Sequence, residues 1–367
     1  MYTEYTDISQ LTNITYTQSV FRCIDFTNQK EILQNTTQCI FLGCTIPLET
    51  FPQLIAKQNL LLQQPELPFS PFRPSLYTPL ELLEGYDSIN PTTFTTHSKD
   101  GLIYAYFKKH SFDEISRLFQ RIHDAAIDDG IDELLSQDGR KSKTVGIMGG
   151  HSLHRNDPIF AKIVVLGYRL AKLGYFIVTG GGPGAMEAGN LGAYLSYLPE
   201  NNFSKELPNI LEILQKAPTY RDRGWIETAL EIRQKFPSDV ESLGVPTWFY
   251  GHEPSNLFAS HIAKYFANSI REDGLLTISY GGIIYAPGSA GTIQEIFQDA
   301  CQNHYETTSH VSPMIFLDCN YWEQKKPIKQ LLHSLSEGKR YQNLIHFCDD
   351  IDEVVDFLQK HPAIEVS

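Results

Sequence analysis

The sequence predicts an α/β fold, a doubly wound parallel sheet, with an additional α+β region at the N-terminal end. Two features indicate this class. From about Val145 onward, apolar runs of strand length alternate with longer stretches of helical periodicity, as βα units do. Two glycine-rich turns stand where a strand of this series gives way to a helix. A chain of 367 residues has room for such a domain and one further region.

Six strand-like runs follow one another in the second part of the chain: residues 145–148, 175–179, 243–248, 282–286, 314–317 and 344–347. Residues 159–173 have the periodicity of a helix between the first two runs. Two further helix-like pieces, residues 210–216 and 225–235, exceed the length of a normal crossover connection. We therefore expect residues 141–367 to form one α/β domain with a helical insertion at about 197–240.

Residues 1–140 differ in sequence character from the rest of the chain. We interpret them as an accessory region of unknown role. The stretches 21–26 and 39–44 alternate bulky apolar and other side chains, which predicts two short strands. They resemble pentapeptide-repeat coils, but two copies are too few for a solenoid, which needs about three. Residues 67–91 contain five prolines and are expected to run extended. An amphipathic helix over 115–126 then leads into the α/β domain.

The composition argues against several functional classes. Thirty basic against 43 acidic side chains give a net charge of −13, which disfavours binding to nucleic acid or to an anionic membrane surface. No apolar run approaches the roughly 20 residues of a membrane-spanning helix, and the first residues lack the features of a signal peptide. The six cysteines form no CxxC pair, so we expect reduced thiols in a cytoplasmic protein. The histidines show no HExxH pattern, and a GxGxxG fingerprint is missing, so we expect neither a metal nor a dinucleotide cofactor.

The two glycine-rich turns carry the chemistry. They are TGGGPGAMEA at residues 179–188 and APGSAGTIQE at residues 286–295. Glycines let the backbone approach an anion, and the helix that follows each turn directs free N–H groups toward it. Two such turns at strand ends of one sheet predict a phosphate-bearing ligand. The alternative is that they are only tight connections between strand and helix.

At these turns the sequence resembles a known family. GGGPGAMEAGNLGA closely matches the GGGPGxMEAxxxGA segment of the LOG-type ("lonely guy", or "lysine decarboxylase-like") proteins, and PGSAGTIQE is similar to their PGGxGTxxE box. The resemblance runs from about Lys143 to the C-terminus and is strongest to a group of longer bacterial LOG-like proteins. It implies a Rossmann-like nucleotide-binding domain. Members of the family cleave nucleoside 5′-monophosphates to the free base and ribose 5-phosphate.

The resemblance also implies two catalytic residues, Glu295 and Arg271. The family glutamate maps directly, whereas the arginine maps onto Arg271 when one inserted residue is allowed before Pro287. A carboxylate one turn into a helix is favoured by the helix dipole and can stabilise the positive charge that develops as an N-glycosidic bond breaks. The alternative is a helix-terminal carboxylate without chemistry. Three residues depart from the family pattern: Ser289 in PGS, Gln294 in place of an acid, and Glu272 in place of a lysine.

The remaining predicted contacts lie in the loops after the strands. The nucleotide or phosphate contacts are Gly149, Gly150, His151, Gly180, Gly181, Gly182, Gly184, Glu187, Gly288, Ser289, Gly291 and Thr292. His252 and Glu253 are candidate contacts for the base or ribose, with a helix-capping loop as the alternative.

The sequence thus predicts a cytoplasmic phosphoribohydrolase-like hydrolase that cleaves the N-glycosidic bond of a nucleoside 5′-monophosphate, without cofactor, metal, nucleic acid or membrane. The alternative is a non-catalytic binding protein or sensor for a nucleotide-derived ligand. We expect a homodimer or higher homo-oligomer, in which an exposed aromatic helix over 258–270 packs on its symmetry mate.

Overall fold

The computed structural model describes residues 3–137 and 139–366. The chain divides into two compact units, one of Met1–Leu76 and Ala105–Ile131, the other of Tyr77–Tyr104 and Asp132–Ser367. Compactness thus groups residues 77–104 with the α/β part of the chain, although the sequence prediction placed them in the accessory region.

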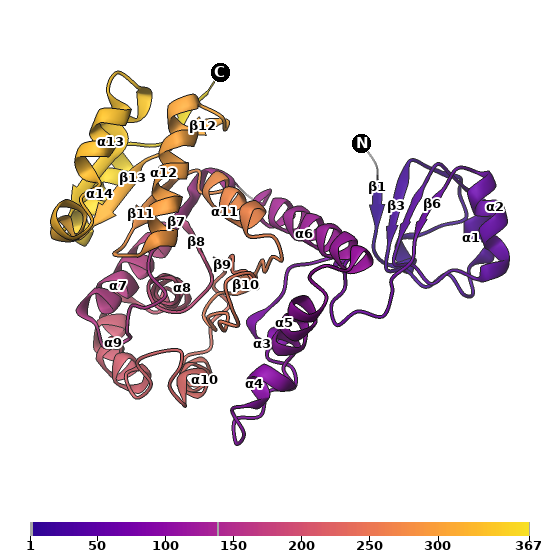
Figure 1. Ribbon diagram of the computed structural model, residues 1–367, viewed down its shortest axis with the longest axis horizontal. Helices are drawn as coiled ribbons and strands as arrows, with labels where there is room; N and C mark the ends of the chain where they lie inside the picture. The colour runs from indigo at the N-terminus through magenta and orange to yellow at the C-terminus, as the bar shows by residue number, and fades with distance from the viewer. Residues whose placement is uncertain (1–2, 138, 367) are drawn as a thin grey trace. The chain divides into compact units, whose positions relative to one another are not determined.

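The larger unit contains a seven-stranded parallel sheet (Figure 1). Its strand order is β10-β9-β8-β7-β11-β13-β14. The strands are β7 (Thr144–Met148), β8 (Phe176–Thr179), β9 (Leu243–Gly244), β10 (His261–Ile262), β11 (Gly282–Tyr285), β13 (Met314–Leu317) and β14 (Ile345–Cys348). The chain winds outward from β7 in one direction and from β11 in the other, so the predicted doubly wound, Rossmann-like fold is confirmed. The order reverses between β7 and β11, where ligands of such sheets bind.

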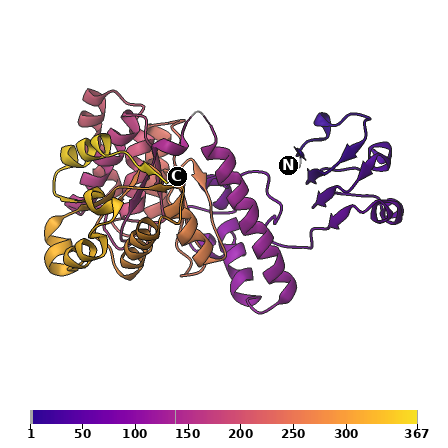
Figure 2. The same cartoon turned by 90° about the horizontal axis from the view of Figure 1, so that it is seen from above.

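Helices cover both faces of this sheet (Figure 2). Helices α7 (Pro158–Lys172), α8 (Ala185–Leu195) and α14 (Ile351–Lys360) pack together, as do α11 (Asn268–Thr277), α12 (Ala290–Tyr305) and α13 (Lys329–Ser336). Glycines bring α7 and α8 close, because a Cβ at Gly192 would lie 2.2 Å from the Val164 carbonyl oxygen. None of the described helices is long and apolar enough to cross a membrane.

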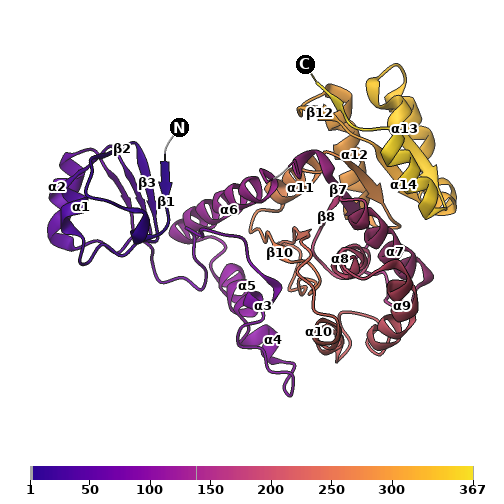
Figure 3. The same cartoon turned by 180° about the vertical axis from the view of Figure 1, so that it is seen from behind.

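The predicted insertion at 197–240 contains two helices, α9 (Glu200–Leu214) and α10 (Trp225–Lys235), which pack against each other (Figure 3). The first is longer than expected. Its Phe203 ring stacks on Tyr168 of α7 at 3.7 Å, which ties the insertion to the core.

The expected aromatic helix over 258–270 is wrong. Helix α11 begins only at Asn268, and the preceding residues form loop and the two-residue strand β10. Phe258, Tyr265 and Phe266 are 0%, 1% and 3% exposed, because their rings fill the core instead of a surface. The surface proposed for a symmetric dimer is therefore not present at these residues.

The smaller unit begins with a short parallel solenoid. Strands β1 (Thr3–Tyr5), β3 (Ser19–Arg22), β5 (Ile40–Leu42) and β6 (Leu60–Leu62) form one sheet. Helices α1 (Lys30–Gln34) and α2 (Phe51–Ala56) lie in the connections, and β2 (Tyr16–Thr17) pairs with β4 (Thr36–Thr37). Val20 pairs with Ile40 and Ile40 with Leu60, so these two coils have 20 residues each, whereas Glu4 pairs with Val20 and the first coil has 16. The prediction of only two strands is corrected: the repeat runs through four.

Further elements include four helices and one two-stranded antiparallel pair. Helices α3 (Pro79–Leu82), α4 (Thr93–Thr96), α5 (Lys99–Lys109) and α6 (Glu114–Leu135) follow the solenoid, and α6 contains the predicted helix 115–126. Near the C-terminus, β12 (His310–Val311) pairs antiparallel with β15 (Ile364–Glu365).

Candidate functional site

A cavity of about 270 Å³ is lined by the turns that follow β7, β8 and β11, together with the 246–254 loop and helix α11. These turns lie at the carboxyl ends of the central strands, the position expected for a ligand site. The following predicted residues line it: Gly149, Gly150, His151, Gly180, Gly182, Glu253, Arg271, Ser289, Gly291, Thr292 and Glu295. Gly184 and Glu187 line a smaller neighbouring cavity instead. Gly181, Gly288 and His252 lie outside both linings.

The turn after β8 requires its glycines for close packing. Gly181 and Gly184 have φ angles of 72° and 73°, in the left-handed region that favours glycine. A Cβ at Gly184 would lie 2.4 Å from the Gly150 carbonyl oxygen. Gly181 and Gly184, which lie outside the main cavity, therefore shape the turn, and Gly182 between them lines the cavity.

The turn after β11 leads into α12 and presents its first turn to the cavity through Ala290, Gly291 and Thr292. The backbone N–H groups at a helix N-terminus have no partner within the helix and carry partial positive charge. A Cβ at Gly288 would lie 2.1 Å from Thr292 Oγ1, whereas a Cβ at Gly291 would meet no atom within 4 Å. Gly288 is thus needed by the protein's own packing, and Gly291 leaves room for a ligand.

Arg271 and Glu295 meet in the cavity. Arg271 Nη1 lies 3.2 Å from Glu295 Oε1, and both residues are 8% exposed. The guanidinium also donates to the carbonyl oxygens of Val245 at 2.7 Å and Gly180 at 3.4 Å. Burial raises the pKa of Glu295, the Arg271 charge counteracts this, and the nearby Glu272 adds to the rise. The placement of Arg271 agrees with the match that allows one inserted residue.

Two of the departures from the family pattern are bonded to each other. Gln294 Nε2 donates to Glu272 Oε2 at 2.5 Å, and Tyr250 Oη donates to Glu272 Oε1 at 3.0 Å. Glu272 is 4% exposed and lines the cavity. Glu272, which replaces the family lysine, and Gln294, which replaces the family acid, are therefore hydrogen-bonded to each other. Sequence reasoning singled out both changes but missed Tyr250, which no motif marks.

His252 belongs to a buried cluster behind the 246–254 loop. Its ring stacks on Phe94 at 4.4 Å and on Tyr104 at 5.0 Å, and its Nε2 lies 3.3 Å from Asp100 Oδ2. Lys264 Nζ lies 2.8 Å from Asp100 Oδ1 and donates to the Glu253 carbonyl oxygen at 3.3 Å.

The Asp100 carboxylate is paired within this cluster. Burial opposes ionisation of Asp100, but Lys264 and His252 hold its pKa below the ordinary value. The cluster fixes the backbone of Glu253, so His252 supports the loop instead of contacting a ligand in the main cavity.

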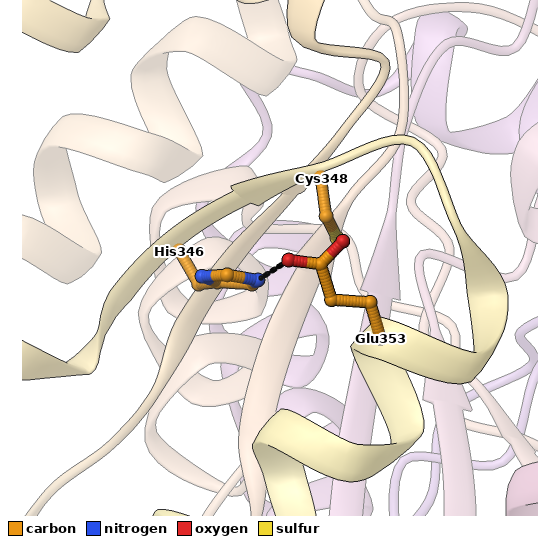
Figure 4. Close-up of side chains that lie close together, drawn as sticks. All are labelled: His346, Cys348 and Glu353. Atoms are coloured by element: carbon orange, nitrogen blue, oxygen red, sulfur yellow. Dashed lines mark hydrogen bonds and ion pairs between the residues drawn. The ribbon is translucent and has the colours of Figure 1, made fainter.

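One group of metal-ligating side chains stands apart from the cavity within the described part of the chain: His346, Cys348 and Glu353 (Figure 4). His346 Nε2 lies 2.9 Å from Glu353 Oε1, and the His346 ring stacks on Phe357 at 4.4 Å. Burial raises the pKa of Cys348 to about 12, so its thiol stays protonated at neutral pH. An ion pair and a core thiol account for this group.

Comparison with known proteins yields structural neighbours of low sequence identity. No family model matches the sequence, and no curated protein matches it. The molybdenum cofactor binding protein from the phototrophic bacterium Rippkaea orientalis is 14% identical over 59% of this chain and 95% of that one, with a TM-score of 0.37. The protein TM1055 is 18% identical over 60% and 99%, with a TM-score of 0.38. The molybdenum cofactor carrier protein of Chlamydomonas reinhardtii is 14% identical over 59% and 98%, with a TM-score of 0.33.

Proposed function

We propose that this chain hydrolyses the N-glycosidic bond of a nucleoside 5′-monophosphate, releasing the base and ribose 5-phosphate. One observation carries the proposal: a single cavity contains the open N-terminal turn of α12 and the buried Arg271–Glu295 pair. The first is a site for a phosphate, and the second provides a carboxylate where a ribosyl cation needs one.

The phosphate binds at the turn before α12. Gly291 leaves open space above the backbone, and Ser289 and Thr292 supply hydroxyl groups on either side of it. A helix N-terminus with small residues binds an anion through its N–H groups and its dipole. The turn after β7, with Gly149 and Gly150, lies beside it and lines the same cavity, and the Gly150 N–H donates to the Pro287 carbonyl oxygen at 3.1 Å.

Glu295 stabilises the reacting carbon. When the bond between C1′ and the base nitrogen breaks, the electron pair leaves with the base and C1′ becomes positively charged. The Glu295 carboxylate faces that charge, and a water oxygen then adds to C1′. One proton of the water passes to the leaving base, and the other stays on the new C1′ hydroxyl. The Arg271 charge counteracts the effect of burial on the pKa of Glu295 and favours its ionised form. Glu253, on the opposite wall, accepts hydrogen bonds from ribose hydroxyls.

The second candidate is a binding protein or sensor without turnover. The observation that favours this candidate is that burial and the nearby Glu272 both raise the pKa of Glu295. A protonated Glu295 leaves the pocket able to bind a nucleotide but removes the charge that stabilises the cation.

The test is incubation of the purified protein with AMP, GMP, CMP, UMP and IMP, with chromatographic detection of base and enzymatic detection of ribose 5-phosphate. Isothermal titration calorimetry measures binding of the same panel. Release of base and ribose 5-phosphate in equal amounts supports the hydrolase. Tight binding without release supports the sensor, and neither binding nor release refutes both.

A further inference from the structure

The second cavity, of about 170 Å³, adjoins the first. His151 and Ser152 line both cavities, so the two meet at the loop after β7. The far wall of the second cavity is the predicted insertion, through residues 218–221 and Trp225. Nothing in the glycine motifs assigns a role to this wall.

The insertion is fixed in place by Arg155, which is 1% exposed. Its guanidinium forms a two-pronged pair with the Glu187 carboxylate, at the start of α8. The same guanidinium donates to Thr228 Oγ1 at 2.9 Å and to the Trp225 carbonyl oxygen at 3.2 Å, and it lies 4.6 Å from the centre of the Trp225 ring. Glu187, predicted to contact the ligand, is therefore occupied by Arg155. Because the Arg155–Glu187 pair holds the insertion in place, the second cavity is preformed.

The walls of this cavity suit a planar ring. Tyr220 is half-buried, and its ring meets the His151 ring edge-to-face at 6.2 Å. Leu153, Pro183 and Pro218 supply apolar surface around it. Apolar and aromatic walls of this kind bind the faces of aromatic rings. His154 and Arg221 also line the cavity, and the Arg221 guanidinium lies 5.4 Å from the centre of the Tyr220 ring. The N-terminal turn of α12 in the first cavity instead suits a phosphate.

We propose that the second cavity holds the nucleobase, with Tyr220 as its stacking platform and the insertion as the element that selects the base. This rests on the proposed function, which seats ribose and phosphate in the first cavity. The glycosidic bond then passes His151 and Ser152, the two residues that line both cavities. On the other side of the first cavity, in the 246–254 loop, Phe249 and Tyr250 are 53% and 61% exposed. A base placed over this loop therefore remains exposed to water.

The experiment measures two ligands on four proteins by isothermal titration calorimetry: the nucleoside monophosphate that binds best to the wild type, and ribose 5-phosphate. Tyr220→Ala removes the platform, and Tyr220→Phe keeps the ring. Phe249→Ala removes an exposed ring from the other side of the first cavity and serves as the matched control. Circular dichroism establishes that each variant is folded.

We expect Tyr220→Ala to weaken nucleotide binding by about 10-fold or more, the usual effect of removing one base-stacking ring. Ribose 5-phosphate binding stays within about twofold of wild type, and Tyr220→Phe and Phe249→Ala bind both ligands like the wild type.

Equal losses for both ligands, no loss for Tyr220→Ala, or a loss confined to Phe249→Ala overturns the placement of the base. If the wild type binds neither ligand, the proposed function itself fails. Should Tyr220→Ala be unfolded, Leu153→Trp replaces it: a bulky ring that fills the second cavity must exclude the nucleotide and spare ribose 5-phosphate, and unchanged nucleotide affinity overturns the placement.

Discussion

Replacing Glu295 by glutamine tests the chemistry most directly. The substitution keeps the size of the side chain and its hydrogen-bonding reach but removes the negative charge. Arg271 retains the carbonyl oxygens of Val245 and Gly180 as partners, so its guanidinium is not left alone. Because burial raises the pKa of Glu295, the ionised carboxylate is costly to the folded state at neutral pH. We therefore expect the variant to fold.

The expected loss of activity follows from the burial of this carboxylate, which is 8% exposed. A unit charge about 5 Å from a developing cation, at an effective dielectric constant of about 20, is worth about 3 kcal/mol. That energy corresponds to a turnover about 100-fold slower. Ground-state affinity changes much less, because the ribose carries no charge before the bond breaks.

The assay is release of base from the preferred nucleotide as a function of pH. In the wild type only the ionised carboxylate is active, so kcat/KM rises with pH through a pKa above the ordinary glutamate value of about 4.3. Glu295→Gln is slow at every pH and loses this rise. Glu353→Gln, which removes a carboxylate far from the cavity, behaves like the wild type. A Glu295→Gln enzyme within about threefold of the wild-type rate refutes the role of Glu295.

Three further predictions concern binding and stability. Gly291→Val projects into open space in the cavity, so titration calorimetry should show nucleotide affinity at least about 10-fold weaker with an unfolding free energy within about 1 kcal/mol of wild type. Burial raises the pKa of Asp299 to about 7 from 3.8, so the folded state holds this proton more tightly and wild-type stability falls as pH rises from about 4 to about 7. Asp299→Asn should remove about 2–3 kcal/mol of that fall between pH 5 and pH 8, measured by urea unfolding at these two pH values. Lys264→Met leaves Asp100 buried without its cation and should cost about 3–5 kcal/mol in urea unfolding, most of which Asp100→Leu in the same chain should restore.

The α/β sheet was predictable because its strands are continuous apolar runs. The run at 314–317 coincides with β13, and those at 145–148 and 282–286 differ from β7 and β11 by one residue. Strand β10 has two residues and no periodicity of its own, so it was missed. The helix predicted over 258–270 failed for a related reason: helical spacing of aromatic residues does not reveal that their rings are buried by distant parts of the chain.

The solenoid has a sequence signal that the prediction of two strands did not include. Gln18, Gln38 and Gln58 recur every 20 residues, and each has a positive φ angle at the entry to a strand. Side-chain bonding supports the repeat, because Gln38 Nε2 donates to Gln58 Oε1 at 3.1 Å. Residues 60–62 contain three leucines without alternation, which hid the third copy of the pattern.

The site was predictable where a motif fixes the backbone and unpredictable where distant side chains meet. The glycine turns place Gly180, Gly291 and Glu295 at the cavity as expected. The role of His252 depends on Asp100, which lies 152 positions earlier in the chain and has no motif. Pairs of this kind are created by the tertiary fold, and a single sequence does not show them.

The exchange of charges at Glu272 and Gln294 leads to a last prediction. Relative to the LOG-type pattern of a lysine and an acid, this chain has an acid and an amide, so the wall of the cavity carries one more negative charge. Glu272 raises the pKa of Glu295, so we expect the altered wall to shift the onset of the proposed activity toward higher pH. The double variant Glu272→Lys with Gln294→Glu keeps a bonded pair and reverses the sign of the nearer charge.

We expect the rise of kcat/KM in this double variant to move to lower pH by about one unit, corresponding to about 1.4 kcal/mol of interaction. Glu272→Gln removes the charge without adding one, and its profile should lie between the two. An unchanged or higher pH of onset in the double variant contradicts the electrostatic coupling. It would show instead that Glu272 acts only through its bond to Tyr250 and leaves the proton affinity of Glu295 to burial and Arg271.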